Sequence, residues 1–192
     1  YWMRTRLIET PIFLKLVENN SVCQTPVTTS LNFKFKEIIT VAFVVAVGAV
    51  INYIIIIFAP IYFILNRHLS SPMALSFCSV SLLVVVIFCI LCGYLSDHLN
   101  RRYLLLAVTF VCALVCWPLD HLINQGNPGQ ILLAQLIFSI LEGSYFGAMM
   151  AYLAEIFPAK IRYTSLSFGY NIGFAIFAGI TPIVAAYMVH YL

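Results

Sequence analysis

The chain has 192 residues, of which 62% are hydrophobic and 9% are charged, and its formal net charge is +3. Soluble domains carry a charge on about a quarter of their residues, so this composition excludes a soluble globular protein and favours the lipid bilayer as the surrounding medium. The few basic residues form no stripe along the chain, which argues against a nucleic-acid partner.

Residues 1–37 are polar and are expected to form a cytoplasmic segment that leads into the membrane. Within this segment, residues 6–16 repeat an apolar side chain every four positions, which predicts a short amphipathic helix with Pro11 in its first turn. Residues 18–30 are rich in Asn, Thr and Ser and predict a linker.

Residues 38–192 are predicted to form the membrane part of the chain, because about 20 apolar residues are enough to cross a bilayer. Five transmembrane helices are expected, at about 38–65, 73–94, 103–123, 130–154 and 163–189. The predicted fold class is therefore all-α, a polytopic integral membrane protein.

The basic residues predict the orientation of these spans. Nine of the ten Lys and Arg residues fall in the N-terminal segment, in the loop at 93–102 or in the hinge at 155–162, and Arg67 is on the other side. Cytoplasmic loops carry an excess of Lys and Arg. The N-terminus and these two loops are therefore expected in the cytoplasm.

Glu142 lies at the middle of the fourth span, where an ionised carboxylate costs at least about 2.5 kcal/mol. Gln135, Ser139 and Tyr145 share its helical stripe. Two interpretations remain equally favoured: a proton or substrate ligand, and a protonated carboxyl bonded to a neighbouring helix. A separate face carries small residues suited to close helix packing, at Gly143, Gly147 and Ala151.

Other polar residues lie within the first and fifth spans. Asn52 and Tyr53 are near the middle of the first span, and Asn171 follows Thr164 and Ser167 in the fifth. Each alone is more typical of contacts between helices than of a ligand. The cysteine pairs at 89/92 and 112/116 lie in apolar runs without metal-ligand spacing, so no metal or cofactor is expected. The chain shows no catalytic motif, and we do not expect an enzyme.

The loop at 93–102, GYLSDHLNRR, resembles the G-x-L-S-D-x-x-G-R-R loop of the major facilitator superfamily. The match is carried by Gly93, Asp97, Arg101 and Arg102. Asn100 stands where the superfamily has Gly, and a left-handed backbone is expected there because Asn tolerates it better than most residues.

Two further segments resemble the metabolite:proton symporters of that superfamily, a group that includes proline/glycine-betaine, oxoglutarate and shikimate transporters. RLIETPIF matches a central-loop motif through Arg4 or Arg6, Glu9, Thr10, Pro11 and Phe13. AEIFPAKIRYTSLSFGYNIG matches a second motif through Glu155, Phe157, Pro158, Arg162, Tyr163, Ser167, Tyr170, Asn171 and Gly173. All three matches are in the order that the group shows.

The resemblance implies that the five spans correspond to helices 7–11 of a twelve-helix carrier, with helices 1–6 and 12 missing from this chain. It implies a bacterial inner membrane and alternating access between two halves. The expected partners are the bilayer, a proton, a small-molecule substrate and the missing six-helix half.

On this resemblance, the substrate or proton pathway is expected to include Asn52, Tyr53, Ser139, Glu142, Tyr145 and Asn171. Gly93, Asp97, Arg101 and Arg102 would form a gating loop, and Glu155, Pro158 and Arg162 a cytoplasmic hinge. The leading hypothesis is proton symport of a compatible solute such as proline or glycine betaine. The alternatives are half of a dicarboxylate, oxoglutarate or shikimate symporter, and an inactive truncated membrane remnant.

Overall fold

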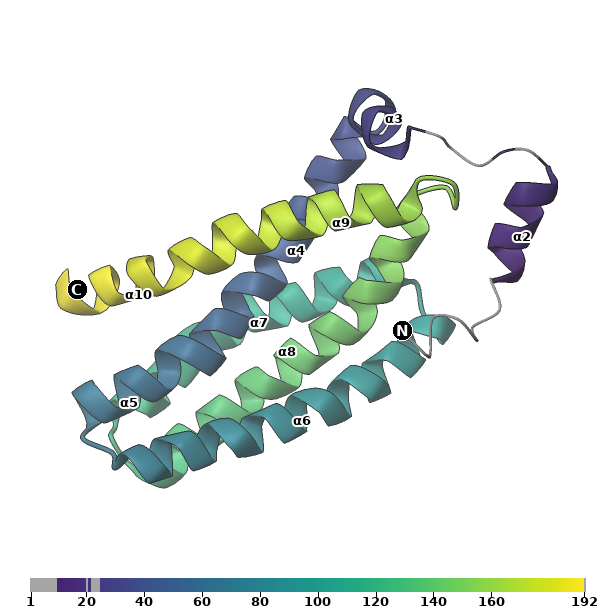
Figure 1. The fold of residues 1–192 in the computed structure, drawn as a ribbon. Helices are drawn as coiled ribbons and strands as arrows, with labels where there is room; N and C mark the ends of the chain where they lie inside the picture. Colours follow the sequence, from purple (N-terminus) through teal and green to yellow (C-terminus); the bar gives the residue numbers. More distant parts are fainter. Residues whose placement is uncertain (1–9, 20, 22–24, 192) are drawn as a thin grey trace, which may run out of the picture.

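The structure, a computed structural model, describes residues 10–19, 21 and 25–191. This part of the chain is helical and contains no strand (Figure 1). Its elements are α2 (Pro11–Glu18), α3 (Pro26–Phe33), α4 (Phe35–Tyr53), η1 (Ile54–Phe58), α5 (Ala59–Arg67), α6 (Ser71–His98), α7 (Arg101–Asn124), α8 (Pro128–Ile156), α9 (Arg162–Gly173), η2 (Phe174–Ala178) and α10 (Gly179–Tyr191).

Among the described residues, five helical segments are long and apolar enough to cross a membrane. The first consists of α4, η1 and α5, and the last of α9, η2 and α10, while α6, α7 and α8 each form one span. The predicted all-α fold with five membrane-spanning helices is thus confirmed. The division at residue 37 into a cytoplasmic segment and a membrane part stays a prediction.

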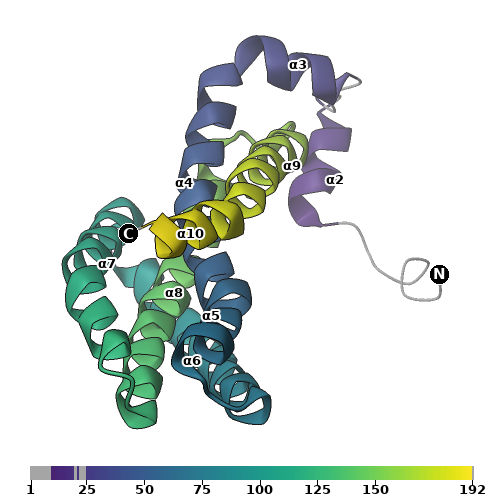
Figure 2. The ribbon, with the colours of Figure 1, turned by 90° about the vertical axis from the view of Figure 1, so that its left-hand side faces the viewer.

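Helix α8 is the central element of the bundle and its most buried span. It packs against α6 and α7 along its length and against α4 on a further side, and α4 in turn packs against α9 and η2. Figure 2, which looks along the bundle, shows α8 with α7, α5 and α6 around it. We call the end with the α6–α7 and α8–α9 connections the Arg101 end, and the opposite end the Arg67 end.

Glycines allow α6 and α8 to touch through their backbones. A Cβ atom built on Gly147 would lie 2.4 Å from the carbonyl oxygen of Cys89 and 2.8 Å from the amide nitrogen of Gly93. One built on Gly143 would lie 2.4 Å from the carbonyl oxygen of Val85. A side chain of any size is therefore excluded at both positions, and the predicted close-packing role of this small-residue face is correct.

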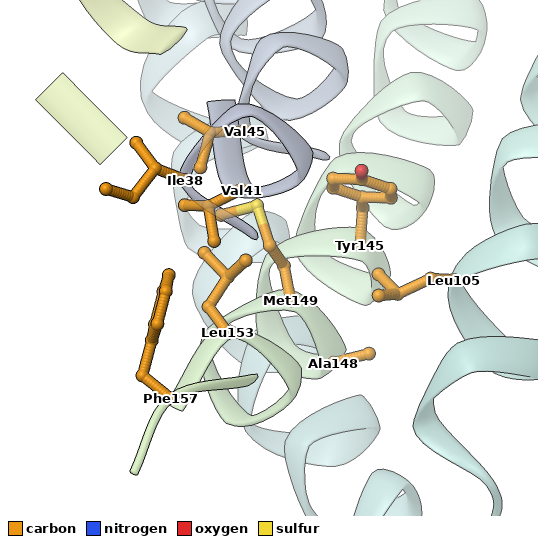
Figure 3. Close-up of a cluster of buried hydrophobic side chains, with 9 residues drawn as sticks. All are labelled: Ile38, Val41, Val45, Leu105, Tyr145, Ala148, Met149, Leu153 and Phe157. Carbon is orange, nitrogen blue, oxygen red and sulfur yellow. The ribbon is translucent and has the colours of Figure 1, made fainter. Parts of the chain in front are cut away.

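Two apolar clusters hold the bundle together, and polar side chains lie between them. The larger cluster joins α4, α7 and α8 and comprises Ile38, Val41, Val45, Leu105, Tyr145, Ala148, Met149, Leu153 and Phe157 (Figure 3). The second, toward the Arg67 end, comprises Phe63, Leu69, Ala74, Phe77 and Ile131. On α8, the buried residues Gln135, Ser139 and Glu142 fall between the two clusters.

The first and last spans each contain one widened, π-helical turn. Pro60 follows η1 and Pro182 follows η2. Proline has no N–H and its ring collides with the carbonyl four residues earlier, and a wider turn relieves that collision. The Cys78 thiol lies 3.6 Å from the carbonyl oxygen of Ile55 and 3.8 Å from that of Ile56, where it can donate to the loosened turn.

The structure corrects the expectations for the N-terminal segment. The described helix begins at Pro11 with Thr10 as its N-cap, and residues 6–9 lie outside the described part of the chain. Residues 26–33 form α3 rather than the end of a linker. Its first turn begins with Pro26, and the buried hydroxyl of Ser165 on α9 donates to Ser30 at 2.8 Å. This contact between distant segments gives α3 a partner that composition alone does not reveal.

Candidate functional site

The buried carboxyl of Glu142 and the half-buried amide of Asn52 form a hydrogen-bonded pair in the middle of the bundle. The Glu142 side chain on α8 is 0% exposed, and its Oε1 accepts a 2.6 Å hydrogen bond from Nδ2 of Asn52 on α4. Asn52 is the second-last residue of α4, two positions before the first residue of the widened turn η1. The structure therefore joins two residues that sequence analysis proposed separately, 90 positions apart.

The second oxygen of this carboxyl group, Oε2, is buried and has no hydrogen-bond partner. Two other buried oxygens on α6 and α8 share that property, Oγ of Ser81 and Oε1 of Gln135. Buried polar atoms in folded proteins are nearly always paired, with protein or with ordered water. These open oxygens in the interior of the bundle indicate places for water, a proton or a polar ligand. Sequence analysis missed Ser81, one of several similar serines on α6.

The remaining members of the predicted stripe on α8 are already bonded. Ser139 donates to the carbonyl oxygen of Gln135 at 2.8 Å, within its own helix. Tyr145 is buried and its hydroxyl donates to the carbonyl oxygen of Val44 at 2.7 Å, which ties α8 to α4. Ser139 can still accept a hydrogen bond, whereas Tyr145 already contributes to helix packing.

Tyr53 and Asn171 make their contacts elsewhere, and among the described residues neither is a hydrogen-bond partner of Glu142. Tyr53 is half-buried and its ring meets the edge of the Phe174 ring at 6.3 Å, and Phe174 also stacks on Tyr170 at 5.2 Å. Asn171 is exposed on α9, where its amide donates to the carbonyl oxygen of Ser167 and lines a shallow hollow. Tyr53, Tyr170 and Phe174 therefore form an aromatic group that joins α4 to the last span.

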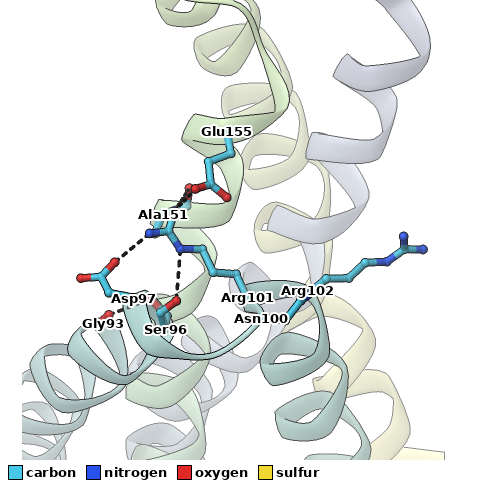
Figure 4. A network of polar contacts seen from close by, with 8 residues as sticks. All are labelled: Gly93, Ser96, Asp97, Asn100, Arg101, Arg102, Ala151 and Glu155. Carbon is cyan, nitrogen blue, oxygen red and sulfur yellow. Dashed lines mark hydrogen bonds and ion pairs between the residues drawn. The ribbon is translucent and has the colours of Figure 1, made fainter.

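A network of charged side chains lies at the Arg101 end of the bundle (Figure 4). The Arg101 guanidinium, on α7, pairs with Asp97 on α6 at 2.7 Å and with Glu155 on α8. It also donates to the backbone carbonyls of Ser96 and Ala151. One side chain thus links three helices. Both carboxylates are well exposed, so each ion pair contributes little to stability, about 1 kcal/mol or less.

Three other predicted residues of these loops have different roles. Arg102 points away from the network in Figure 4. Gly93 faces Gly147 on α8 and permits the close approach of α6. The expected left-handed backbone at Asn100 is wrong: its φ is −66°, and its side chain caps α7 by accepting from the backbone N–H of Arg102. Asn is favoured for that capping role, which the sequence pattern did not distinguish from a turn.

The predicted hinge lies between α8 and α9. Pro158 follows the end of α8, and the amide of Ile161 donates to its carbonyl oxygen, which forms a tight turn. Arg162 begins α9 and its Nε donates to the carbonyl oxygen of Phe157 at 3.0 Å. Glu155 belongs instead to the network with Arg101. Within the described residues, no group of three or more His, Cys, Asp or Glu side chains could hold a metal ion.

Comparisons with known proteins agree with this architecture. The family model described as Major Facilitator Superfamily matches residues 41–192. A citrate-proton symporter of Klebsiella pneumoniae is 28% identical over 98% of this chain and 42% of its own length. One of Salmonella typhi is 30% identical over 97% of this chain and 43% of its own length. A proline/betaine transporter of Escherichia coli K12 is 27% identical over 98% of this chain and 39% of its own length.

No solved structure matches the chain. The chain spans about two fifths of the length of the curated relatives named above. Its five apolar helices and its similarity to these membrane transporters identify it as a multi-pass integral membrane protein. Together with the motifs at 93–102 and 154–173, the comparisons show that the chain belongs to the Major Facilitator Superfamily, in its metabolite:proton symporter group.

Proposed function

We propose that this chain contributes five helices to a secondary active transporter that couples a proton to the uptake of a small metabolite by alternating access. One observation carries the proposal: Glu142 is a fully buried carboxyl group with one oxygen bonded to Asn52 and the other open. Such a group can gain and lose a proton without losing the hydrogen bond that Asn52 donates. Intramembrane carboxylates in carriers are typical of proton relays.

A compatible solute such as proline or glycine betaine is the substrate class that we favour. The Arg and Lys side chains of the described spans lie near helix ends, so the middle of the bundle presents a carboxyl group and no cation to a substrate. Tyr53 follows Asn52 in the sequence, and its ring belongs to an aromatic group with Tyr170 and Phe174. Aromatic rings attract quaternary ammonium groups, whereas a citrate trianion would be repelled by the Glu142 carboxylate.

Uptake into membrane vesicles tests both parts of the proposal. Vesicles that contain the complete carrier would be given labelled glycine betaine, proline or citrate, with and without an inward proton gradient. We expect gradient-driven accumulation of betaine or proline. Accumulation of citrate instead would overturn the proposed substrate class and still support proton symport. If none of the three solutes accumulates in response to the gradient, proton symport is contradicted.

The orientation is a second part of the proposal, with the N-terminus and the Arg101 end in the cytoplasm. Single cysteines placed at 126 and 160 in a cysteine-free variant of the complete carrier should react differently with an impermeant thiol reagent added to intact cells. Position 126, in the α7–α8 turn, should be labelled from outside, and position 160 only after the cells are opened. Labelling of position 160 in intact cells would reverse the assignment.

Asp97→Asn should slow turnover about two- to fivefold, because an exposed ion pair is worth about 1 kcal/mol or less. The change weakens one of the two pairs that Arg101 makes across α6 and α8. Asp97 lies at the end of α6, far from Glu142 along the bundle, so substrate affinity should stay the same. The check is the rate of substrate exchange alongside equilibrium binding. A large loss of affinity at a normal exchange rate would show that Asp97 acts on the binding site.

A further inference from the structure

A cavity of about 210 Å³ lies between α5, α7, α8 and α10, toward the Arg67 end of the bundle. Its wall is mostly apolar, with polar groups from Asp120 on α7, Gln135 on α8 and the hydroxyl of Tyr62 on α5. Asp120 is exposed and Gln135 is 2% exposed, so the cavity leads from the protein surface into the interior. The volume is ample for several waters, since one water needs about 10–15 Å³ of cavity space.

The inner wall of the cavity presents an unsatisfied hydrogen-bond acceptor. The Gln135 amide nitrogen lies 3.8 Å from the Cys78 sulfur, but its buried Oε1 has no partner in the described part of the chain. At the outer end, Asp120 accepts from the Asn124 amide at 2.9 Å, and Asn124 also bonds Arg67 and Tyr62. Asp120 and Arg67 are thus linked through Asn124 at this end of the cavity.

The polar atoms continue from Gln135 toward Glu142. Cys78 lies opposite Gln135, and Val85 and Cys89 lie opposite Gly143, so α6 and α8 run parallel in a fixed register. Ser81 on α6 is therefore level with Ser139 on α8. Both hydroxyls fall between Gln135 and Glu142, which are about 10 Å apart along the helix axis at 1.5 Å per residue. The open oxygens of Gln135, Ser81 and Glu142 all belong to this one track.

We propose that this track is hydrated and carries protons between the Asp120 cavity and Oε2 of Glu142. A water held by Gln135 Oε1 would lead to a second water shared by Ser81, Ser139 and Glu142. The proton moves along these hydrogen bonds, and the Glu142 carboxylate takes it up at Oε2 to become the neutral acid. Gln135 anchors the first water and does not itself titrate. Asn52 on α4 donates to the other carboxyl oxygen of Glu142, Oε1, and the Cys78 thiol on α6 lies opposite Gln135.

The proposal rests on the proposed role of Glu142, but water access to its carboxyl can be measured without transport. The complete carrier would be reconstituted at a pH low enough to protonate Glu142, and the C=O stretching band would be followed by infrared spectroscopy after transfer to D₂O. The band is assigned by its loss in Glu142→Gln. Its shift reports exchange of the carboxyl proton for deuterium.

Gln135→Leu removes the amide oxygen at nearly unchanged volume, and Ser81→Ala removes one hydroxyl. Each should slow the exchange about tenfold or more, as expected when a bridging water loses a hydrogen-bond partner. Ser144→Ala is the matched control, because the Ser144 hydroxyl on the same helix is already bonded to the carbonyl of Ile140. It should exchange at the wild-type rate.

Slowing of less than tenfold in both track variants would overturn the proposal, and Ser81→Ala decides alone if Gln135→Leu does not insert. Equal slowing in Ser144→Ala would also overturn it, since the effect would then come from general loosening of α8. If gradient-driven uptake survives Glu142→Gln, the proposed coupling role of Glu142 is refuted. The infrared measurement then still tests separately whether the track is hydrated.

Discussion

Replacing Glu142 by Gln in the complete carrier is expected to abolish accumulation driven by a pH gradient, while exchange of substrate across the membrane continues. A gradient of one pH unit supports about tenfold accumulation if one proton moves with each substrate, because a tenfold ratio corresponds to about 1.4 kcal/mol. The amide cannot take up a proton, so the accumulation ratio should fall to about one. Gln keeps an oxygen that can accept from Asn52, and the bundle should fold as before.

The measurement compares uptake and exchange of the same labelled solute in vesicles. Wild-type uptake should rise as the external pH falls, and uptake by Glu142→Gln should be independent of pH. Glu37→Gln is a suitable control, because it removes an acidic side chain that pairs with Lys34 at the start of α4, away from the interior. Accumulation retained in Glu142→Gln would assign the carboxyl a structural role, as a protonated partner of the neighbouring helix.

The five spans could be predicted from the sequence because apolar runs of sufficient length allow few alternatives in a bilayer, where backbone groups must bond within their own helix. The small-residue face of α8 was equally predictable, since only helix packing explains glycines four residues apart in an apolar segment. The ion pair of Asp97 with Arg101 follows from their spacing on adjoining helix ends. Each of these features depends on residues that are close together in the sequence, so a short sequence pattern is enough to predict it.

The pairing of Asn52 with Glu142 could not be predicted in the same way. Both residues were candidates, but no spacing rule relates positions on α4 and α8. The same applies to Glu155, which belonged to a hinge motif by sequence and joins Arg101 in the structure. The capping role of Asn100 shows a different limit: Asn suits both a left-handed turn and an N-cap, and only the backbone conformation separates them.

Gly147→Ala is expected to loosen or unfold the bundle, because α6 and α8 meet through their backbones at this position. The added methyl carbon would lie 2.4 Å from the Cys89 carbonyl oxygen and 2.8 Å from the Gly93 amide nitrogen. Neither is the end of a flexible side chain, so the two helices must move apart. Overpacking of this kind costs about 1–3 kcal/mol, and a fall of about 2–12 °C in the unfolding temperature in detergent should result.

Gly179→Ala provides a matched control for that prediction. Gly179 begins α10 with a helical backbone, and a Cβ atom built there meets nothing within 4 Å. The same chemical change should therefore leave the unfolding temperature unchanged or raise it slightly, because Ala favours the helix more than Gly does. Cys89 offers a second measurement: it is half-buried on α6 beside Gly147, and its thiol should react faster with a maleimide in Gly147→Ala than in Gly179→Ala. Equal unfolding temperatures and equal thiol reactivity in the two variants would mean that α6 and α8 are further apart than the glycine contacts require.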